Sequence, residues 1–297
     1  MLTIGVSGYS GFVGKNLCHF LSQEGYTIKK VNTRNIISND TLNDCDIFIH
    51  LAGIAHDLNS KYNYDDYYKV NFELTKKLYD LYLRSSCRNF IFFSSIKSIA
   101  DKSNFPLTEN VPANPKSDYG RTKLLAEEYI QNYKCTGLKK YFILRPSMIH
   151  GYHNKGHLNL LYKFVKMGLP WPFGVYKNQR SFCSIDNLCF ILKKIIENDN
   201  INSGVYHICD SGTLSTNELI TIINESLNKK SNILQVPKLL INFIASIGTI
   251  LHLPLNNDKL KKISESLIID NSKILKEINQ KLPIDIKLGL KKTIKSF

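Results

Sequence analysis

The sequence predicts an α/β protein in which a doubly wound parallel sheet is joined to a smaller mixed α/β lobe. Strand-like and helix-like segments alternate along the first half of the 297-residue chain, which is typical of a parallel sheet covered by helices on both faces. The strand-like segments are continuous apolar runs, as expected for strands buried on both sides. A glycine-rich turn joins the first strand to the first helix.

The individual elements follow from local patterns. Six short apolar runs are predicted as strands: 2–6, 27–31, 47–52, 90–93, 141–144 and 205–209. Three segments with apolar residues at helical spacing are predicted as helices: 12–22, 65–83 and 118–133. Ser215 and Glu218 form a capping-box pattern, so a further helix is expected to begin there.

Charge and cysteine content narrow the classes of function. The 39 Lys and Arg residues outnumber the 25 Asp and Glu residues, and the formal net charge of +14 attracts anions. No basic cluster interleaved with aromatic residues is present, so nucleic acid is not an expected partner. The seven cysteines are scattered, without metal-ligand or dithiol spacing. With a strand-like segment directly after Met1, they predict a cytoplasmic protein with reduced thiols and no metal site.

The longest apolar run covers residues 239–253. It is too short to span a bilayer and carries polar residues at Asn242, Ser246 and Thr249. We expect a buried helix or a lid. The alternative is a helix that lies on a membrane surface, because an apolar helix beside basic residues is attracted to anionic lipid.

Three glycines, Gly8, Gly11 and Gly14, follow the first strand and open the first helix. Glycine is needed where the backbone turns tightly and where it approaches a pyrophosphate without an intervening side chain. The helix N-terminus then offers free N–H groups to the phosphates. This position in the chain predicts a Rossmann-type dinucleotide site. The residues expected at the cofactor are Gly8, Ser10, Gly11, Phe12, Val13 and Gly14.

These patterns divide the chain. Residues 1–150 are expected to form the dinucleotide-binding domain, and residues 151–297 mainly a substrate-binding lobe. The pattern loosens after Pro146, where Gly, Pro and aromatic residues crowd 168–174. Residues 180–209 are expected to return to the main sheet.

The choice between NAD and NADP depends on the end of the second strand. An NAD-selective site usually has Asp or Glu there, which accepts hydrogen bonds from the ribose hydroxyls. This chain has Asn32, Thr33 and Arg34 instead. Arg34 could pair with the 2′-phosphate of NADP, so the sequence favours NADP over NAD; a solvent-facing arginine is the alternative.

Tyr119 and Lys123 lie four residues apart and share one helix face. A nearby cation favours the tyrosinate and lowers the pKa of the phenol, and a phenol so tuned can exchange a proton with a carbinol oxygen. The strand 90–93 leads directly into Ser94 and Ser95, whose hydroxyls can hydrogen-bond the same substrate oxygen. Ser95, Tyr119 and Lys123 are therefore predicted as catalytic residues, with Ser94 as a helper at the substrate.

With these motifs in this order, the chain resembles the extended short-chain dehydrogenase/reductase family over nearly its whole length. The other motifs that carry the resemblance are Ile47–Ala52, Val70-Asn71 and Arg145-Pro146. It implies NAD or NADP as cofactor, held also by Leu51, Ala52, Gly53, Asn71, Tyr119, Lys123 and Pro146. The short segment from Arg34 to Asp46 departs from the family, which has a third strand and helix there.

The resemblance also implies a homodimer formed through the helices 65–84 and 118–133. The first of these helices carries more apolar residues than a one-sided helix needs. They are Tyr67, Val70, Leu74, Leu78, Leu81 and Tyr82.

Residues beside Ser95 bear on the reaction. Dehydratases of this family carry Asp-Glu directly after the active hydroxyl and dual epimerase-reductases of GDP-sugars carry Cys, whereas this chain has Ile96-Lys97. Residues 94–97, 168–174 and 266–272 look like those of reductases of the C4 ketone in a UDP-4-keto-6-deoxy-N-acetylhexosamine, used for surface-polysaccharide precursors. That reduction is the favoured interpretation, and a UDP-N-acetylhexosamine or UDP-hexose 4-epimerase is the alternative.

The resemblance extends to the substrate side. Arg180 matches the family's arginine on the UDP diphosphate, and a planar guanidinium binds phosphate oxygens in pairs; a structural arginine is the alternative. His157 and Asn159 are candidates for the uridine side. A hypothesis of another class is a cofactor-sensing regulator without catalysis, against which the presence of Ser95, Tyr119 and Lys123 argues.

Overall fold

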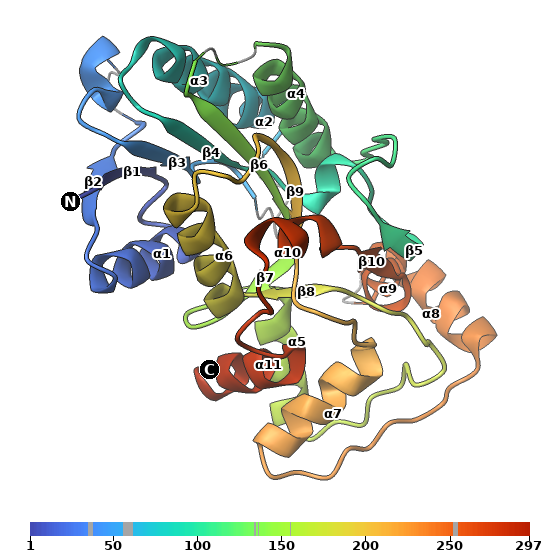
Figure 1. Cartoon of the computed structure of the whole chain (residues 1–297). Coiled ribbons are helices and arrows are strands. Elements are labelled where there is room, and N and C mark those ends of the chain that lie inside the picture. The colour runs from blue at the N-terminus through green and yellow to red at the C-terminus, as the bar shows by residue number, and fades with distance from the viewer. Residues whose placement is uncertain (35–37, 56–61, 134, 136, 155, 252–254) are drawn as a thin grey trace.

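A six-stranded sheet, with every strand parallel to its neighbours, forms the centre of the molecule (Figure 1). The computed structural model describes residues 1–34, 38–55, 62–133, 135, 137–154, 156–251 and 255–297. The strands lie in the order β2 (Thr27–Val31), β1 (Thr3–Ser7), β3 (Ile47–His50), β4 (Asn89–Phe93), β6 (Lys140–Pro146) and β9 (Gly204–Ile208). The chain winds one way from β1 to β2 and the other way from β3 onwards. The predicted Rossmann-type fold is thus confirmed, with its switch point between β1 and β3.

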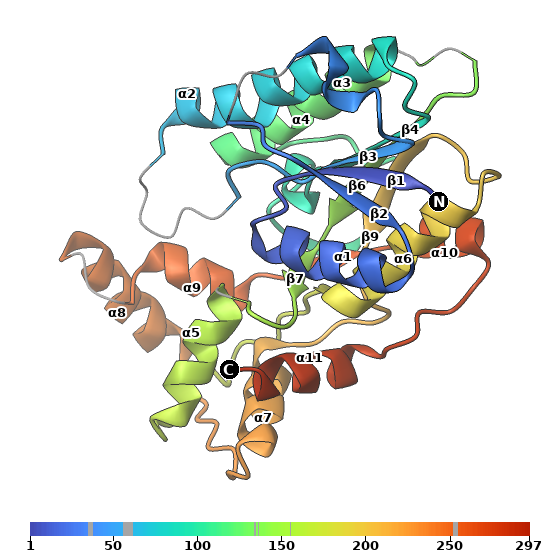
Figure 2. The same ribbon diagram turned by 90° about the vertical axis from the view of Figure 1, so that its left-hand side faces the viewer.

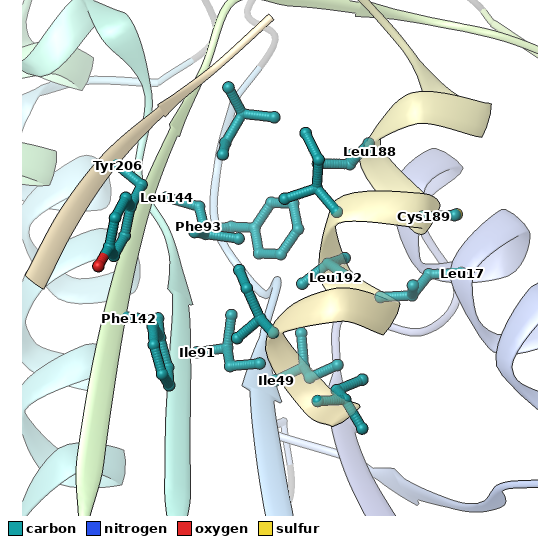
Figure 3. Packing of buried hydrophobic residues seen from close by; sticks show 14 of the residues in the cluster. Leu17, Ile49, Ile91, Phe93, Phe142, Leu144, Leu188, Cys189, Leu192 and Tyr206 are labelled. Atoms are coloured by element: carbon teal, nitrogen blue, oxygen red, sulfur yellow. The ribbon is translucent and has the colours of Figure 1, made fainter. Parts of the chain in front are cut away.

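Two sets of helices cover the sheet. On one face lie α2 (Tyr64–Tyr67), the π-helical segment η2 (Tyr68–Glu73), α3 (Leu74–Arg84) and α4 (Asp118–Asn132). On the other face lie α1 (Phe12–Gln23), α6 (Ile185–Glu197) and α10 (Ser272–Ile278). Figure 3 shows Leu17 of α1 and Leu188 and Leu192 of α6 directed at the strands.

Alternation along the strands explains why their sequences are apolar throughout. In β4, Phe90 and Phe92 pack toward α3 and α4, while Ile91 and Phe93 pack toward α1 and α6. Successive side chains point to opposite faces of a sheet, so a strand covered on both faces needs an apolar residue at every position. The same requirement made these strands visible in the sequence.

A second core lies below the carboxyl ends of the main strands. It joins Trp171 and Phe182 with residues of α5 (His157–Lys166), α7 (Thr216–Ser226), α8 (Lys238–Ile250), α9 (Asn257–Ser264) and α11 (Ile286–Lys295). Two small parallel sheets connect the two regions: β5 (Ser103–Leu107) with β10 (Leu267–Ile269), and β7 (Met148–His150) with β8 (Phe182–Ser184). Ser215 and Glu218 form the expected capping box of α7.

The C-terminal half is more interwoven than the sequence suggested. Within 180–209, α6 and β9 join the main sheet, whereas β8 pairs with β7. The short helix α10 also returns to the main sheet and packs against β9 and α6. Figure 2 shows α10 beside the sheet and α11 beside α7.

The segment between β2 and β3 is as short as the sequence indicated. Its described part holds only the 3-10 helix η1 (Asn39–Leu42). As a result β2 is an edge strand of the described sheet.

Two expectations about apolar surfaces need correction. Leu78, Leu81 and Tyr82 of α3 are buried in the core and add nothing to an outer face, whereas Tyr67, Val70 and Leu74 are half-buried. The second expectation concerned the apolar run 239–253. In its described part only Ile241, Ala245 and Gly248 are buried, so this run does not form a buried helix.

Candidate active site

The glycine loop lies where β1 and β3 end. Gly8 has φ +69°, and a Cβ there would lie 2.6 Å from the backbone nitrogen of Ala52. A Cβ on Gly14 would lie 2.3 Å from the carbonyl oxygen of Gly8. Both positions therefore exclude a side chain. Helix α1 begins beyond Gly11, which makes no side-chain cap, so its first N–H groups remain available to an anion. Ser10 is exposed, and Phe12 and Val13 are half-buried.

The segment after β3 reaches across to α4 through Asn71. Its Oδ1 accepts from the backbone N–H of Ile54 (2.9 Å), and its Nδ2 donates to the Ile54 carbonyl (3.1 Å) and Thr122 Oγ1 (3.4 Å). A Cβ on Gly53 would lie 2.9 Å from Asn71 Oδ1 and 3.3 Å from Lys123 Nζ. The predicted residues Leu51, Ala52, Gly53 and Asn71 thus line one short stretch at the switch point, which fits a dinucleotide.

A buried polar chain beneath this stretch went unnoticed in the sequence. His50 contacts Ser7 Oγ through Nδ1 (2.7 Å) and Thr75 Oγ1 through Nε2 (2.9 Å). Thr75 donates to the carbonyl of Asn71 (2.7 Å), so it accepts from His50 and the ring carries its proton on Nε2. Burial, helped by the positive charge of Lys123, holds the pKa of His50 well below its usual range. A neutral histidine therefore joins the end of β3 to β1 and to the first turn of α3.

Ser95 and Tyr119 meet at the carboxyl end of β4. Ser95 caps the 3-10 helix η3 (Ile96–Ser98) by accepting from the N–H of Lys97 (3.2 Å). A Cβ on Gly120 would lie 2.2 Å from the Lys97 carbonyl oxygen, so the first turn of α4 rests directly on η3. The close packing places the Tyr119 phenol within hydrogen-bonding reach of the Ser95 hydroxyl.

Lys123 lies one turn further along α4 and is buried. Its Nζ donates to the Phe93 carbonyl (2.7 Å) and lies 4.6 Å from the centre of the Phe92 ring. Burial lowers the pKa of Lys123 to about 7, against the opposing effect of Glu127. The amine is therefore close to its titration point at neutral pH.

The expected electrostatic effect of Lys123 on Tyr119 is wrong. Burial raises the pKa of Tyr119, and the hydrogen bond with Ser95 offsets this only in part. Helical spacing placed the two side chains on one face, but the Lys123 amine is directed to Phe93 and Gly53 rather than to the phenol. Tyr119 is accordingly a neutral phenol, ready to donate a proton.

Glu127, which the sequence did not single out, holds this region together. Ser94 donates to its Oε1, as does Ser98 (2.7 Å). Arg145 Nε donates to both carboxylate oxygens (3.1 and 3.0 Å). All four side chains are buried. The proton of the Ser94 hydroxyl is committed to Glu127, so Ser94 acts here as a positioning residue that ties β4 to α4.

Pro146 ends β6 and is followed by a buried hydroxyl. Within the described part of the chain, Ser147 Oγ and the neighbouring Arg145 Nη1 lack a hydrogen-bond partner. A buried polar atom without a hydrogen-bond partner lowers the stability of the fold. The Ser147 hydroxyl, directly after Pro146, is placed to hydrogen-bond the carboxamide of a bound nicotinamide.

The candidates for the substrate lie in the second core region. Arg180 Nη1 donates to the carbonyls of Lys262 (3.0 Å) and Glu265 (3.3 Å) at the end of α9. Asn159 Nδ2 donates to the carbonyl of Asn154 (3.4 Å). His157 is the first residue of α5, and its side chain lies outside the described part. Arg34 is exposed in the turn after β2. The structure therefore gathers the predicted catalytic residues more closely than the predicted substrate residues.

The fold and the glycine loop together indicate a dinucleotide-dependent enzyme. The model of the NAD dependent epimerase/dehydratase family matches residues 4–209. The chain belongs to this family and is an NAD(P)-dependent enzyme.

Curated relatives and solved structures are similar to most of the chain. A UDP-glucose 4-epimerase of Vibrio cholerae is 25% identical over 98% of this chain and 94% of its own. N-acetyl-alpha-D-glucosaminyl-diphospho-ditrans,octacis-undecaprenol 4-epimerase of Escherichia coli O157:H7 is 29% identical, over 58% of this chain and 52% of its own.

Two solved structures share the fold at low identity. The UDP-N-acetylglucosamine 4-epimerase from Bacillus cereus superposes with a TM-score of 0.79 at 20% identity, over 99% of both chains. RMD from Pseudomonas aeruginosa, solved with NADPH, gives 0.75 at 18% identity over 100% of this chain and 99% of its own. At these identities the likeness shows the fold alone.

Proposed function

We propose that the chain is a 4-epimerase of a UDP-linked hexose or N-acetylhexosamine. The observation that carries the proposal is the grouping of Ser95, Tyr119 and Lys123 at the carboxyl end of the sheet. The names of the relatives support it, since several are 4-epimerases of UDP-sugars.

The residues suit proton transfer at the sugar oxygen O4. A bound nicotinamide supplies hydride chemistry at the neighbouring carbon. The neutral Tyr119 phenol must first lose its own proton to solvent. As tyrosinate it would take the proton of the O4 hydroxyl while C4 is oxidised, and would return that proton when C4 is reduced. Ser95 donates a hydrogen bond that orients O4. Lys123, held near Gly53, is proposed to bind the nicotinamide ribose, and Arg180 to bind the diphosphate.

A second candidate is the 4-reductase that the sequence favoured. The short segment between β2 and β3 supports it, because few residues are then available to hold the adenosine half of the cofactor. A reductase requires a cofactor that exchanges after every turnover, whereas an epimerase recovers its hydride. The two candidates use the same Ser95, Tyr119 and Lys123.

One experiment separates the two candidates. We expect the purified protein to interconvert UDP-N-acetylglucosamine and UDP-N-acetylgalactosamine with no net change in NAD, as followed by chromatography of the sugar nucleotides. A UDP-4-keto-6-deoxy-N-acetylhexosamine is supplied with NADPH in parallel. Stoichiometric loss of NADPH in that sample, without interconversion in the first, would establish the reductase instead.

Arg34 provides a test of cofactor preference, for which we propose NADP. A charge-assisted hydrogen bond contributes about 1.5–3 kcal/mol. Arg34→Ala is therefore expected to weaken NADPH binding by roughly 10- to 100-fold and to leave NADH binding unchanged. Arg88→Ala, which removes an exposed arginine just before β4, is the control. Titration calorimetry with equal losses for both cofactors, or with none, would refute the preference.

We also propose that two copies associate through α2–α4, as the family resemblance implies. The half-buried Tyr68, Phe72 and Tyr129 lie on these helices. The Phe72 ring contacts both the Tyr68 ring and the Tyr129 ring.

A further inference from the structure

The helix α8 presents an apolar face that the described chain leaves uncovered. Along α8 and the residue after it, seven large apolar side chains are at least 37% exposed. They are Leu239, Leu240, Phe243, Ile244, Ile247, Ile250 and Leu251. Large contiguous apolar patches on a protein surface mark contacts with other molecules or with membranes.

The orientation of this face is fixed by the opposite side of the helix. Ile241, Ala245 and Gly248 are buried against the second core, and Asn242 accepts from the Tyr176 hydroxyl (3.1 Å). In both views α8 lies at the margin of the molecule beside α9 (Figure 1 and Figure 2). The apolar face is therefore held outward by the packing of the fold.

Positive charge lies beside this face. Residues 238–262 contain four lysines and a single acidic residue, Asp258. Lys238 begins α8, and Lys259, Lys261 and Lys262 are exposed on α9, which packs against it. A second copy of the chain docked on this face would bring the same lysines together, and their charges would repel. An anionic surface complements the lysines.

We propose that α8 docks this enzyme on an anionic lipid bilayer, with its apolar face in the boundary between headgroups and acyl chains. An amphipathic helix with a basic surround binds in this way through buried apolar area and attraction to anionic lipid. Among the described residues no helix is long and apolar enough to cross a membrane, so the contact is peripheral. The inference goes beyond the proposed function and does not depend on it.

Docking would also orient the substrate region. Arg180, proposed to bind the diphosphate, donates to the carbonyls of Lys262 and Glu265 at the end of α9. Because α9 packs against α8, docking would fix the orientation of α9, and with it that of Arg180, relative to the bilayer.

Vesicle sedimentation tests the proposal. The full chain is mixed with vesicles of phosphatidylcholine and phosphatidylglycerol in equal parts, and with vesicles of phosphatidylcholine alone. We expect binding to the first that is weak or lost with the second. The triple variant Leu239→Gln, Phe243→Gln, Ile250→Gln should lower the partition coefficient by more than about tenfold, because each side chain removed from lipid loses apolar transfer energy.

Two further variants control the result. Phe105→Gln, Leu138→Gln, Met167→Gln changes three equally exposed apolar side chains elsewhere and should bind as the parent does. Lys259→Gln, Lys261→Gln, Lys262→Gln should weaken binding to the anionic vesicles only. Circular dichroism checks that each variant is folded, and the single variant Phe243→Gln replaces the triple one if that variant unfolds.

Other outcomes would overturn the proposal. Equal binding by the parent and the α8 variant would place the contact elsewhere, and no binding by the parent would remove it. A dimer seen by light scattering that the α8 variant loses, without vesicle binding, would make α8 a surface between two copies.

Discussion

Tyr119→Phe is expected to lower turnover by roughly 10²–10⁴, which is the usual contribution of a positioned acid–base group. The substitution removes only the phenolic oxygen, and the remaining ring keeps its packing beside Tyr67. Folding and cofactor binding should therefore stay close to those of the parent. Initial rates with the UDP-sugar that the purified protein converts, together with cofactor titration, measure both effects.

A matched control is Tyr133→Phe, which removes an exposed phenol at the far end of α4 and should leave turnover unchanged. If Tyr119→Phe retained turnover within a factor of a few of the parent, the proton would have to come from another group. The Ser–Tyr–Lys assignment would then fail.

Glu127→Ala is expected to destabilise the protein by about 3–5 kcal/mol, because it leaves the buried Arg145 guanidinium without its partner. The carboxylate also accepts from Ser94 and Ser98, so these two hydroxyls lose a partner as well. Urea denaturation of parent and variant measures the difference. Glu225→Ala breaks the exposed pair with Lys291 and should cost no more than about 1 kcal/mol.

The same residue has a second, independent effect. Glu127 raises the pKa of Lys123, which burial lowers to about 7. Glu127→Gln removes this negative charge while keeping the shape of the side chain, so the pKa of Lys123 should fall further. The limb of the pH–rate profile that reports Lys123 should then move to lower pH. For the stability prediction, a loss of less than about 1 kcal/mol in the free energy of unfolding of Glu127→Ala, as for an exposed pair, would contradict the structural role of Glu127.

The main sheet could be predicted because its strands carry their own signal. Strands buried on both faces must be apolar at every position, and β2, β3 and β4 were found within two residues of their observed ends. The glycine loop was equally readable, since Gly8 and Gly14 occupy positions where any Cβ would collide with backbone.

Buried polar partners could not be predicted in the same way. Glu127 pairs with Arg145, which lies 18 residues away along the chain, and His50 pairs with Ser7, which lies 43 residues away. No local sequence pattern encodes such a pairing. The pKa of Tyr119 was misjudged for a related reason. Spacing on a helix fixes which face a lysine occupies, but the direction of its amine depends on the Phe93 carbonyl across the fold.

The periodicity of the apolar residues in α8 could not show whether this helix is buried or exposed. A helix that is apolar on nearly all sides is normally buried, and the sequence alone cannot tell whether the rest of the fold covers it. Here the second core occupies one narrow stripe of the helix, at Ile241, Ala245 and Gly248.

The edge position of β2 has a consequence for solubility. An edge strand offers a row of N–H and C=O groups that can pair with a strand of another molecule, and natural proteins discourage this with charged residues, especially lysine. Lys29 and Lys30 stand in the middle of β2, where Lys29 pairs with Asp44 (3.1 Å) and Lys30 lies over the Tyr9 ring. The short connection to β3 leaves β2 at a margin of the described sheet, and two lysines in the middle of this strand are the kind of residue that discourages its pairing with a strand of another molecule.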